Sequence, residues 1–525
     1  MSDNENSSPV LRGRRRIYTD VEEINAKNIF TELSNAVIKH SENQADIKFL
    51  LNYEKGVQPL KREKKIREEI DIKVSDNVAN QIVEFKLGYN WGNPILYVQR
   101  GNKDLNNSTD TDNSNQDSAV SMLNEMNDSE YSFMKDQELA RYVEITGIGF
   151  QMVDIKPEYD GLSAFDLITL NPMSTFCIYR NTARQEKVAG VTFRKLEDGT
   201  TYYTVFTDTI RFEVKNLNQI VNGERKNKWS FMQRSGESNP IGKIPIVEFN
   251  RAPDRTGCFE RQISDMDALN IEVSDFANSV AQKTQEVWWG NDFDLPEDES
   301  GKPNPPVSGQ WLMTKTSSGG SNPLLKAISS EFDYSGVQEN IVSKRNLILQ
   351  KCYVPLQSEP GGGSTGSAMS MSSGWSAAEA AACKEAQVVR RGKTEVSALE
   401  LIAIKKSLDI PEDSPLKRLS ISDIKPQFTR NKTYDMATKV NSMVAMIKSG
   451  INGRVAMEQV DLFQDVAQAW VDSKDMVEKY QKSIIEKGNS GQQETKREQS
   501  DLSDQTENSP ILDGMKIDDS GGDEQ

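Results

Sequence analysis

Histidine is almost absent from this 525-residue sequence, and cysteine is rare. The single histidine, His40, lies on a predicted surface helix, where we expect it to be solvated, and one imidazole cannot supply a histidine-based triad or metal cluster. The cysteines lie far apart with no Cys-x-x-Cys pair, which predicts reduced, isolated thiols rather than disulfides or a zinc site. They are Cys177, Cys258, Cys352 and Cys383. Without these common catalytic and metal-binding arrangements, we expect no metal and no cofactor.

Long apolar runs are missing as well. No stretch approaches the roughly 18 apolar residues that span a bilayer, and residues 1–10 lack the apolar segment of a signal peptide. We therefore expect a protein that stays in the cytoplasm where it is made and has no membrane contact. The formal net charge of −16 argues against tight nucleic-acid binding through counterion release, but not against a surface past which nucleic acid slides.

A glycine-rich run superficially resembles a phosphate-binding loop. It comprises Gly361, Gly362, Gly363, Ser364, Thr365, Gly366 and Ser367. The run lacks the Lys-Ser/Thr pair of a P-loop, and the strand and helix expected around that motif are wrong here. Asp265 and Asp267, the kind of acidic pair that can serve as acid and base, are predicted to lie on a solvated helix face. We therefore predict that the protein is not an enzyme, and that Leu356–Gly374 is a flexible loop.

An apolar seam runs from Phe259 to Trp289 without an interrupting Pro or Gly. Its steps of three, four or seven residues predict one helix about 45 Å long. The seam comprises Phe259, Ile263, Met266, Leu269, Val273, Phe276, Val280 and Val287. A second helix is predicted over Tyr334–Cys352, with Val337, Ile341 and Ile348 on one face. From spacing alone, an ordinary helical hairpin with an inserted lobe over residues 290–332 explains this pattern equally well.

The residues before the seam predict a mixed α+β body, in which helices come first along the chain and an antiparallel sheet follows. Asp20 is placed to cap a first helix, Ser41 and Gln44 form a capping box for a second, and Asn77 begins a third. The polar residues 101–118 predict an exposed loop. Short alternating runs then predict strands, two of them joined by a turn at residues 197–199. The runs include Phe165–Leu170, Thr175–Tyr179, Val188–Leu196 and Tyr202–Phe206.

Beyond the second central helix the chain is again mostly helical. The patterns predict a long helix over Trp375–Leu408, a helical hairpin over Tyr434–Lys448 and Val455–Ala469, and a last helix from Asp472. Residues 488–525 hold ten acidic and three basic residues, a net charge of −7, and are expected to be disordered. Residues 1–16 are also expected to be a disordered tail, with nucleic-acid contact as the minority alternative. That tail ends in Arg12, Arg14, Arg15 and Arg16.

Five segments, in order along the chain, carry a resemblance to a known family. They are Tyr53, Gly56, Gln58, Pro59 and Leu60; then Asn80, Ile82, Val83, Gly88, Tyr89, Gly92, Asn93 and Pro94; then Ile244–Phe249 with Gly257, Phe259, Glu260, Leu269, Asn270, Ser274, Asp275 and Asn278; then Thr365, Gly366, Ser367, Ala368 and Met369; then Phe428, Arg430, Gly450 and Ile451. Over roughly residues 45–485 the sequence resembles the portal proteins of tailed bacteriophages, of the Gram-positive siphophage type. It departs from them at Thr365, in the insertion at 101–118, and near Asp472.

The resemblance implies an α+β portal fold assembled as a ring of about twelve subunits. Its parts map onto the chain as follows: an N-terminal tail over 1–16, a wing over 17–257 with 410–430, a first stem helix over 258–289, a clip over 290–333, a second stem helix over 334–352, a tunnel loop over 353–374, a long helix behind that loop over 375–409, a crown over 431–487, and an acidic tail over 488–525.

The resemblance also implies a function. The ring would be a channel at one capsid vertex through which double-stranded DNA is packaged and ejected. Its partners would be the terminase large subunit, a head-completion adaptor, the scaffolding protein and the major capsid protein. It would reside in the virion after assembly in the host cytoplasm, with the glycine-rich run facing DNA.

Three cations of the second stem helix fit either of two roles. Lys344, Arg345 and Lys351 are placed for transient phosphate contacts or, equally, for salt bridges between subunits to acids of the first stem helix. The alternative reading of the whole chain is a non-channel capsid or scaffold-associated structural protein. No motif supports an enzyme fused to such a scaffold.

Overall fold

The computed structural model describes residues 11, 13–60, 70–99, 110–156, 162–221, 224–232, 236–283, 287–291, 324–328, 333–356, 374–429, 436–460, 462–463, 469–470, 472–480 and 482–483. The chain divides into two compact units, Met1–Lys432 and Thr433–Gln525.

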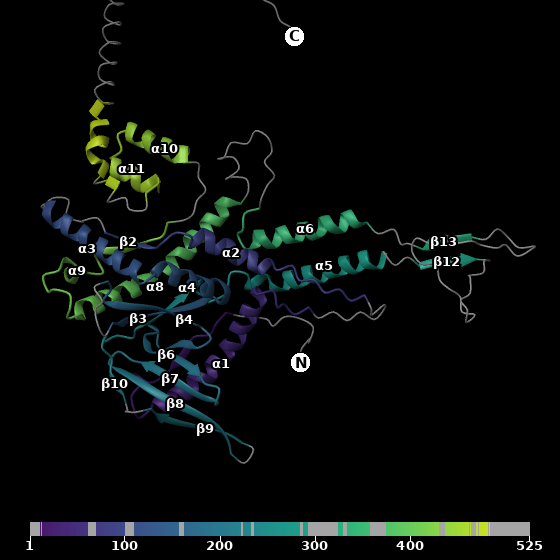
Figure 1. Ribbon diagram of the computed structural model, residues 1–525, viewed down its shortest axis with the longest axis horizontal. Helices are drawn as coiled ribbons and strands as arrows, with labels where there is room; N and C mark the ends of the chain where they lie inside the picture. The colour runs from purple at the N-terminus through teal and green to yellow at the C-terminus, as the bar shows by residue number, and fades with distance from the viewer. Residues whose placement is uncertain are drawn as a thin grey trace, which may run out of the picture. The chain divides into compact units, whose positions relative to one another are not determined.

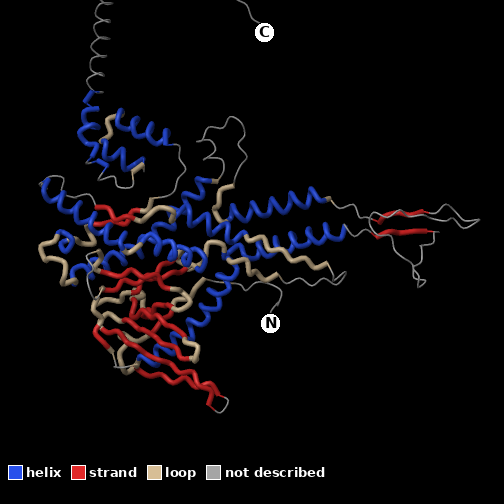
Figure 2. Tube along the Cα trace, viewed as in Figure 1, coloured by secondary structure: helices blue, strands red, loops and turns tan. Residues whose placement is uncertain are grey.

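A seven-stranded sheet forms one part of the first unit (Figure 2). Its strand order is β1-β5-β6-β7-β8-β10, with β9 also paired to β8, and only the β1–β5 pair is parallel. The strands are β1 (Ile17–Thr19), β5 (Thr175–Arg180), β6 (Lys187–Lys195), β7 (Thr200–Phe206), β8 (Ile210–Val221), β9 (Glu224–Phe231) and β10 (Glu237–Ser238). The predicted hairpin at residues 197–199 is confirmed, because β6 and β7 pair directly across it.

One helix, α1 (Ile29–Glu54), covers a face of this sheet (Figure 1). The prediction of two helices here was wrong, because Ser41 lies inside α1, where its hydroxyl donates to the carbonyl of Ile38 at 2.7 Å. Asp20, predicted as a helix cap, does not cap α1, and Asn28 is the residue that precedes its first turn. The apolar face of α1 continues through that point to Ile47, so burial against the sheet outweighs the local capping signal.

His40 on α1 is buried rather than solvated, which corrects the sequence expectation. Its side chain is 1% exposed, with Nε2 3.2 Å from the carbonyl oxygen of Met173 and its ring 4.7 Å from that of Phe176. Burial lowers the pKa of His40 to about 4. The imidazole is therefore a neutral part of the core, one turn after Ala36 on the same buried stripe.

A second layer of helices and short sheets completes this unit around a large apolar core. The sheets are β11-β3-β4 and β14-β2, comprising β2 (Leu96–Gln99), β3 (Ile148–Ile155), β4 (Phe165–Leu170), β11 (Ile246–Asn250) and β14 (Ile424–Gln427). The helices are α2 (Val78–Asn90), α3 (Asp110–Ser129), α4 (Ser132–Thr146), α8 (Trp375–Lys406) and α9 (Pro415–Arg418). Two helix predictions are confirmed, since Asn77 caps α2 by accepting from the backbone N–H of Asn80, and α8 runs as one helix.

The loop predicted over residues 101–118 was wrong in its second half, where α3 begins at Asp110. The C-terminal half of α3 buries Val120, Leu123 and Met126. Once that half is fixed by packing, adding turns on its N-terminal side costs little, so polar residues of modest propensity join the helix. Residues 101–109 lie outside the described residues.

The two central helices run side by side as a hairpin (Figure 1). A short helical turn, η1 (Glu260–Gln262), leads into α5 (Ile263–Lys283), and the partner helix is α6 (Tyr334–Lys351). The prediction of one helix to Trp289 was wrong, because α5 ends at Lys283 and Val287–Asn291 form strand β12, paired with β13 (Leu324–Ile328). Val287, Trp288 and Trp289 favour a strand once a partner strand is present.

The second unit contains a helical hairpin of α10 (Met436–Lys448) and α11 (Gly453–Val460). The predicted hairpin is confirmed over these residues, although α11 ends nine residues before the predicted Ala469. Helical structure is also present over residues 472–480, where the last helix was predicted. The acidic residues 488–525 lie outside the described residues.

Candidate functional site: the α5–α6 hairpin

The apolar seam joins the base of the hairpin to the body. Phe259 is fully buried, and its ring lies 5.9 Å from that of Tyr53 on α1. Of the other predicted seam residues, Ile263, Met266, Leu269 and Ile348 are buried, Val273, Phe276, Val337 and Ile341 are partly buried, and Val280 is 41% exposed. The ring of Phe276 lies 6.1 Å from that of Tyr334 at the start of α6, in an edge-on arrangement. Burial along the seam therefore decreases away from the body.

A row of neutral polar side chains on α5 binds an extended segment of the chain, a role that the sequence pattern did not predict although the three residues belong to the family resemblance. Asn270, Ser274 and Asn278 lie four residues apart, on one face of the helix, and each is at most 2% exposed. We call these three residues the α5 ladder. They bond every second residue of the segment 72–76, as a neighbouring β-strand would.

Two of the three residues of the α5 ladder both accept from and donate to the backbone of the segment. Asn278 accepts from the backbone N–H of Ile72 and donates to its carbonyl, both at 2.9 Å. Ser274 accepts from the N–H of Val74 at 3.0 Å and donates to its carbonyl at 3.1 Å. Asn270 accepts from the N–H of Asp76 at 2.8 Å. The ladder gives backbone N–H and C=O groups of the segment hydrogen-bond partners without burying a charge. The segment in turn covers one side of α5.

The charged side chains of the hairpin pair within the chain. Lys344 pairs with Glu272, and Lys351 with Asp265 at 2.6 Å, so two cations of α6 bind acids of α5 in the same subunit. Asp267 accepts from the Tyr53 hydroxyl at 2.8 Å. The expectation of a solvated face was therefore wrong for Asp267, which is held against α1, whereas the Asp265 side chain is 41% exposed, as expected.

Arg345 also has partners on its own chain. Its guanidinium lies 3.4 Å from Asp76 and donates to Gln81 at 3.0 Å. It is thus tied to the segment that the α5 ladder holds rather than to an acid of α5. Phosphate contact by Lys344, Arg345 or Lys351 would require each cation to exchange a partner that it already has.

The basic cluster near the N-terminus reaches the base of α5, which corrects the prediction of a disordered tail for residues 13–16. The guanidinium of Arg14 is fully buried, donating to Glu260 at 2.6 Å and to the carbonyl of Thr146 at 3.2 Å. Glu260 also accepts from the N–H of Gly257 at 2.8 Å. Arg15 pairs with Glu42 at the surface. Arg12 lies outside the described residues.

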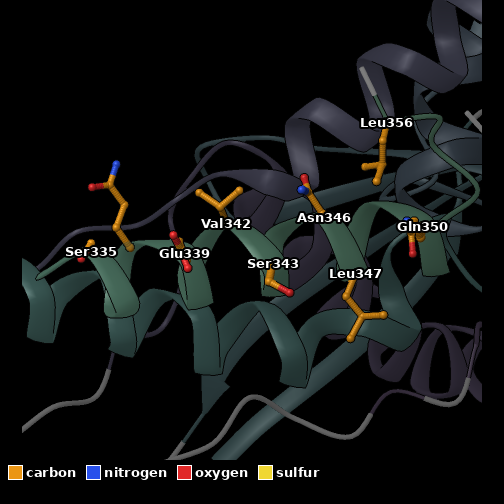
Figure 3. Close-up of a pocket in the computed structure, with 9 residues that line it drawn as sticks. Ser335, Glu339, Val342, Ser343, Asn346, Leu347, Gln350 and Leu356 are labelled. Carbon is orange, nitrogen blue, oxygen red and sulfur yellow. The ribbon is translucent and has the colours of Figure 1, made fainter. Parts of the chain in front are cut away.

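The outward face of α6 is open and lightly polar (Figure 3). Val342 and Leu347 are 49% and 50% exposed. They lie in a hollow of about 720 Å³ lined by Ser335, Gln338, Glu339, Val342, Ser343, Asn346, Leu347, Gln350 and Leu356. All residues of this lining except Glu339 are uncharged, and we call the lining the α6 neutral face. α5 exposes Ile271 and Val280, both at 41%, so each helix leaves apolar side chains uncovered.

The predicted DNA-facing residues Gly361, Gly362, Gly363, Ser364, Thr365, Gly366 and Ser367 lie outside the described residues, as does most of the predicted clip. Within the part of the chain that the structure describes, no group of three or more His, Cys, Asp or Glu side chains is arranged to hold a metal ion. In that same part, no helix combines the length and the apolar character needed to cross a membrane.

Comparison with known proteins places the chain in a family. The sequence matches the family described as "Phage portal protein, SPP1 Gp6-like" over residues 33–488. No curated protein matches it. A chain from the neck of an empty GTA particle, computed with C6 symmetry, is 11% identical, with a TM-score of 0.35 over 77% of this chain and 95% of that one, a likeness too weak to indicate a shared fold. Because the family match spans most of the sequence, the chain belongs to the SPP1 Gp6-like phage portal protein family.

Proposed function

We propose that this protein assembles into the ring-shaped channel at one capsid vertex through which double-stranded DNA is packaged and ejected. Family membership supports a portal role and a structural rather than enzymatic protein. The observation that carries the proposal is the hairpin, which exposes different apolar side chains on α5 and on α6. Contact between two different faces of identical subunits produces a closed ring when the rotation per subunit is right.

The charge of the chain fits a conduit. If about twelve copies assemble, a net charge of −16 per copy gives about −192 per ring. Such a ring repels phosphates at long range, so DNA would pass with weak contacts rather than bind. The cations of α6 are already neutralised by acids of their own chain, which lowers their attraction for phosphate.

The location, the number of subunits and the partners that we propose rest on the family resemblance. We place the assembled ring in the virion after assembly in the host cytoplasm, with about twelve subunits in the ring. Its proposed partners are the terminase large subunit, a head-completion adaptor, the scaffolding protein and the major capsid protein. The narrower Gram-positive siphophage type remains a prediction.

The ring is tested by the mass of the purified full-length protein. Twelve copies of 58.9 kDa give about 707 kDa, which mass photometry resolves from monomers. We expect Leu347→Asp to abolish rings while the subunit stays folded by circular dichroism, because it charges the α6 neutral face without disturbing the core. Leu408→Asp is the matched control, since Leu408 is 96% exposed beyond the end of α8, and should form normal rings.

Three outcomes would count against the proposal or a part of it. Wild-type protein that stays monomeric or dimeric across protein and salt concentrations contradicts ring assembly. Normal rings from Leu347→Asp would show that the α6 neutral face is not a subunit contact. Assemblies without an axial hole, seen by negative stain, would instead favour a non-channel structural protein.

A further inference from the structure

The C-terminal end of α6 places a tyrosine where helices usually place glycine. The N–H of Tyr353 donates to the carbonyl of Gln350 and the N–H of Val354 to that of Leu349, both at 2.9 Å. This pair of hydrogen bonds is a Schellman motif, whose left-handed position favours glycine. Tyr353 takes that position with φ of +59° and is half exposed, so burial of its ring is not what holds it there. A strained residue of this kind persists where its surroundings fix it.

Helix α2 supplies the contact that fixes Tyr353. The ammonium group of Lys86 lies 5.9 Å from the centroid of the Tyr353 ring, within the range of a cation–π interaction. Lys86 is 1% exposed, and its Nζ lies 3.6 Å from Glu385 on α8. Removing an ammonium group from water strengthens its attraction to an aromatic ring. The end of α6 is therefore attached to α2 through a side chain that also faces α8.

The same helix contacts the start of α8. Gly374, with φ of +83°, precedes Trp375, the first residue of α8. The ring of Trp375 lies 6.0 Å from that of Phe85 and 5.6 Å from that of Tyr89, both on α2. The hydroxyl of Tyr89 also donates to Glu379 in the first turns of α8 at 2.6 Å. One helix thus contacts the residues at both ends of the connection between α6 and α8.

We propose that α2 is a clamp that sets the separation between the end of α6 and the start of α8, with Tyr353 and Lys86 as its positioning residues. The clamp explains why a tyrosine occupies a glycine position, because glycine would bond the helix end equally well but could not contact Lys86. Only the purpose of the clamp rests on the proposed function: it would hold the base of the connection in place while DNA passes.

The variant Tyr353→Gly separates a clamp from an ordinary helix end. It relieves the left-handed strain and removes the ring, so the melting temperature should hold or rise while the contact between Tyr353 and Lys86 is lost. Hydrogen exchange of the full-length assembled protein then reports the clamp. We expect amides in residues 374–382, at the far end of the connection, to exchange roughly fivefold faster.

A second tyrosine provides the matched control. Tyr131, between α3 and α4, has φ of +54° and is 70% exposed. Tyr131→Gly should relieve the same strain and leave exchange over residues 374–382 unchanged. Lys86→Met removes the charge from the other side of the clamp, so it should accelerate the same amides, and the double variant should add little.

The outcomes separate the clamp from the portal function. Unchanged exchange over residues 374–382 in Tyr353→Gly, or equal acceleration in Tyr131→Gly, overturns the clamp whatever happens to packaging. Faster exchange together with less nuclease-protected DNA in proheads supports both the clamp and its purpose. Faster exchange with wild-type packaging supports the clamp and contradicts its role during DNA passage.

Discussion

Two regions of the molecule, the α5–α6 hairpin and the body around α8, bury polar groups of opposite kinds. In the body, α8 carries ionisable side chains into the core, where Lys393 pairs with Asp136 and Glu400 is fully buried. Within α5 and α6, beyond the buried Arg14–Glu260 pair at the base, the buried polar groups are the neutral side chains of the α5 ladder, and charged pairs such as Lys344–Glu272 stay partly exposed.

Because of this difference, the buried charges of the body affect the stability of the fold, while the exposed charges of the hairpin are available for assembly. Taking a charge out of water is costly, so breaking a buried pair leaves a large penalty, which locks the elements that it joins. Neutral amides and hydroxyls satisfy backbone groups without that penalty. The hairpin can therefore keep its charges at the surface, where exchanging partners costs little. Substitutions in the body should change folding most, and those at the hairpin surface should change it least.

The largest loss is expected for Lys393→Met. Lys393 pairs with Asp136 and donates to Gln151 at 3.1 Å, and its side chain is 3% exposed. Removing it strands the Asp136 carboxylate in the core, which should lower the free energy of unfolding by about 3–5 kcal/mol. Denaturant unfolding measures the loss. Adding Asp136→Asn should restore part of it, and a double variant as unstable as the single one would show that packing, not charge, dominates here.

Glu400 should make the stability of the body depend on pH. Burial raises the pKa of its carboxyl to about 7. The unfolded chain releases that proton near its ordinary pKa, so the folded state binds more protons between the two values and loses stability as pH rises through them. Glu400→Gln removes this loss. Its stability relative to wild type should increase by about 3 kcal/mol from pH 4 to pH 8, and a pH-independent difference would contradict a raised pKa.

Elements with strong local signals were predictable from the sequence. Asn77 and the apolar face that follows it indicated α2, apolar spacing indicated α6, and an alanine-rich first half indicated α8. What was missed depended on distant partners. The end of α5 is set by the pairing of β12 with Leu324–Ile328. The burial of His40 depends on a sheet whose strands, except β1, come well over a hundred residues later in the chain.

The candidate site was only partly predictable for the same reason. The seam follows from spacing, but the α5 ladder appears in sequence as three small polar residues, ordinarily the mark of a solvated face. Its signal is the strict interval of four between Asn270, Ser274 and Asn278, on a stripe that carries no charge. Tyr353 gave no sequence signal, because only the backbone angle shows that it occupies a glycine position.

An intermediate loss is expected for Ser274→Ala in the ladder. The hydroxyl is fully buried and bonds both backbone groups of Val74, so its removal leaves a donor and an acceptor without their partner. The free energy of unfolding should fall by about 1–2 kcal/mol. Ser279→Ala is the matched control, since that hydroxyl bonds only the carbonyl of Asp275 on its own helix. Equal losses from the two variants would mean that the ladder adds nothing beyond helix propensity.

The smallest effect is expected at the surface of the hairpin, from Lys351→Gln. Lys351 and Asp265 are 2.6 Å apart, but their side chains are 42% and 41% exposed, so water competes for both charges. The free energy of unfolding should change by less than about 1 kcal/mol, and salt should shrink the change further because it screens exposed charges. Denaturant unfolding at low and high salt measures both. A loss as large as that of Lys393→Met would show that assembly buries this pair, and that the surface charges of the hairpin are as fixed as those of the body.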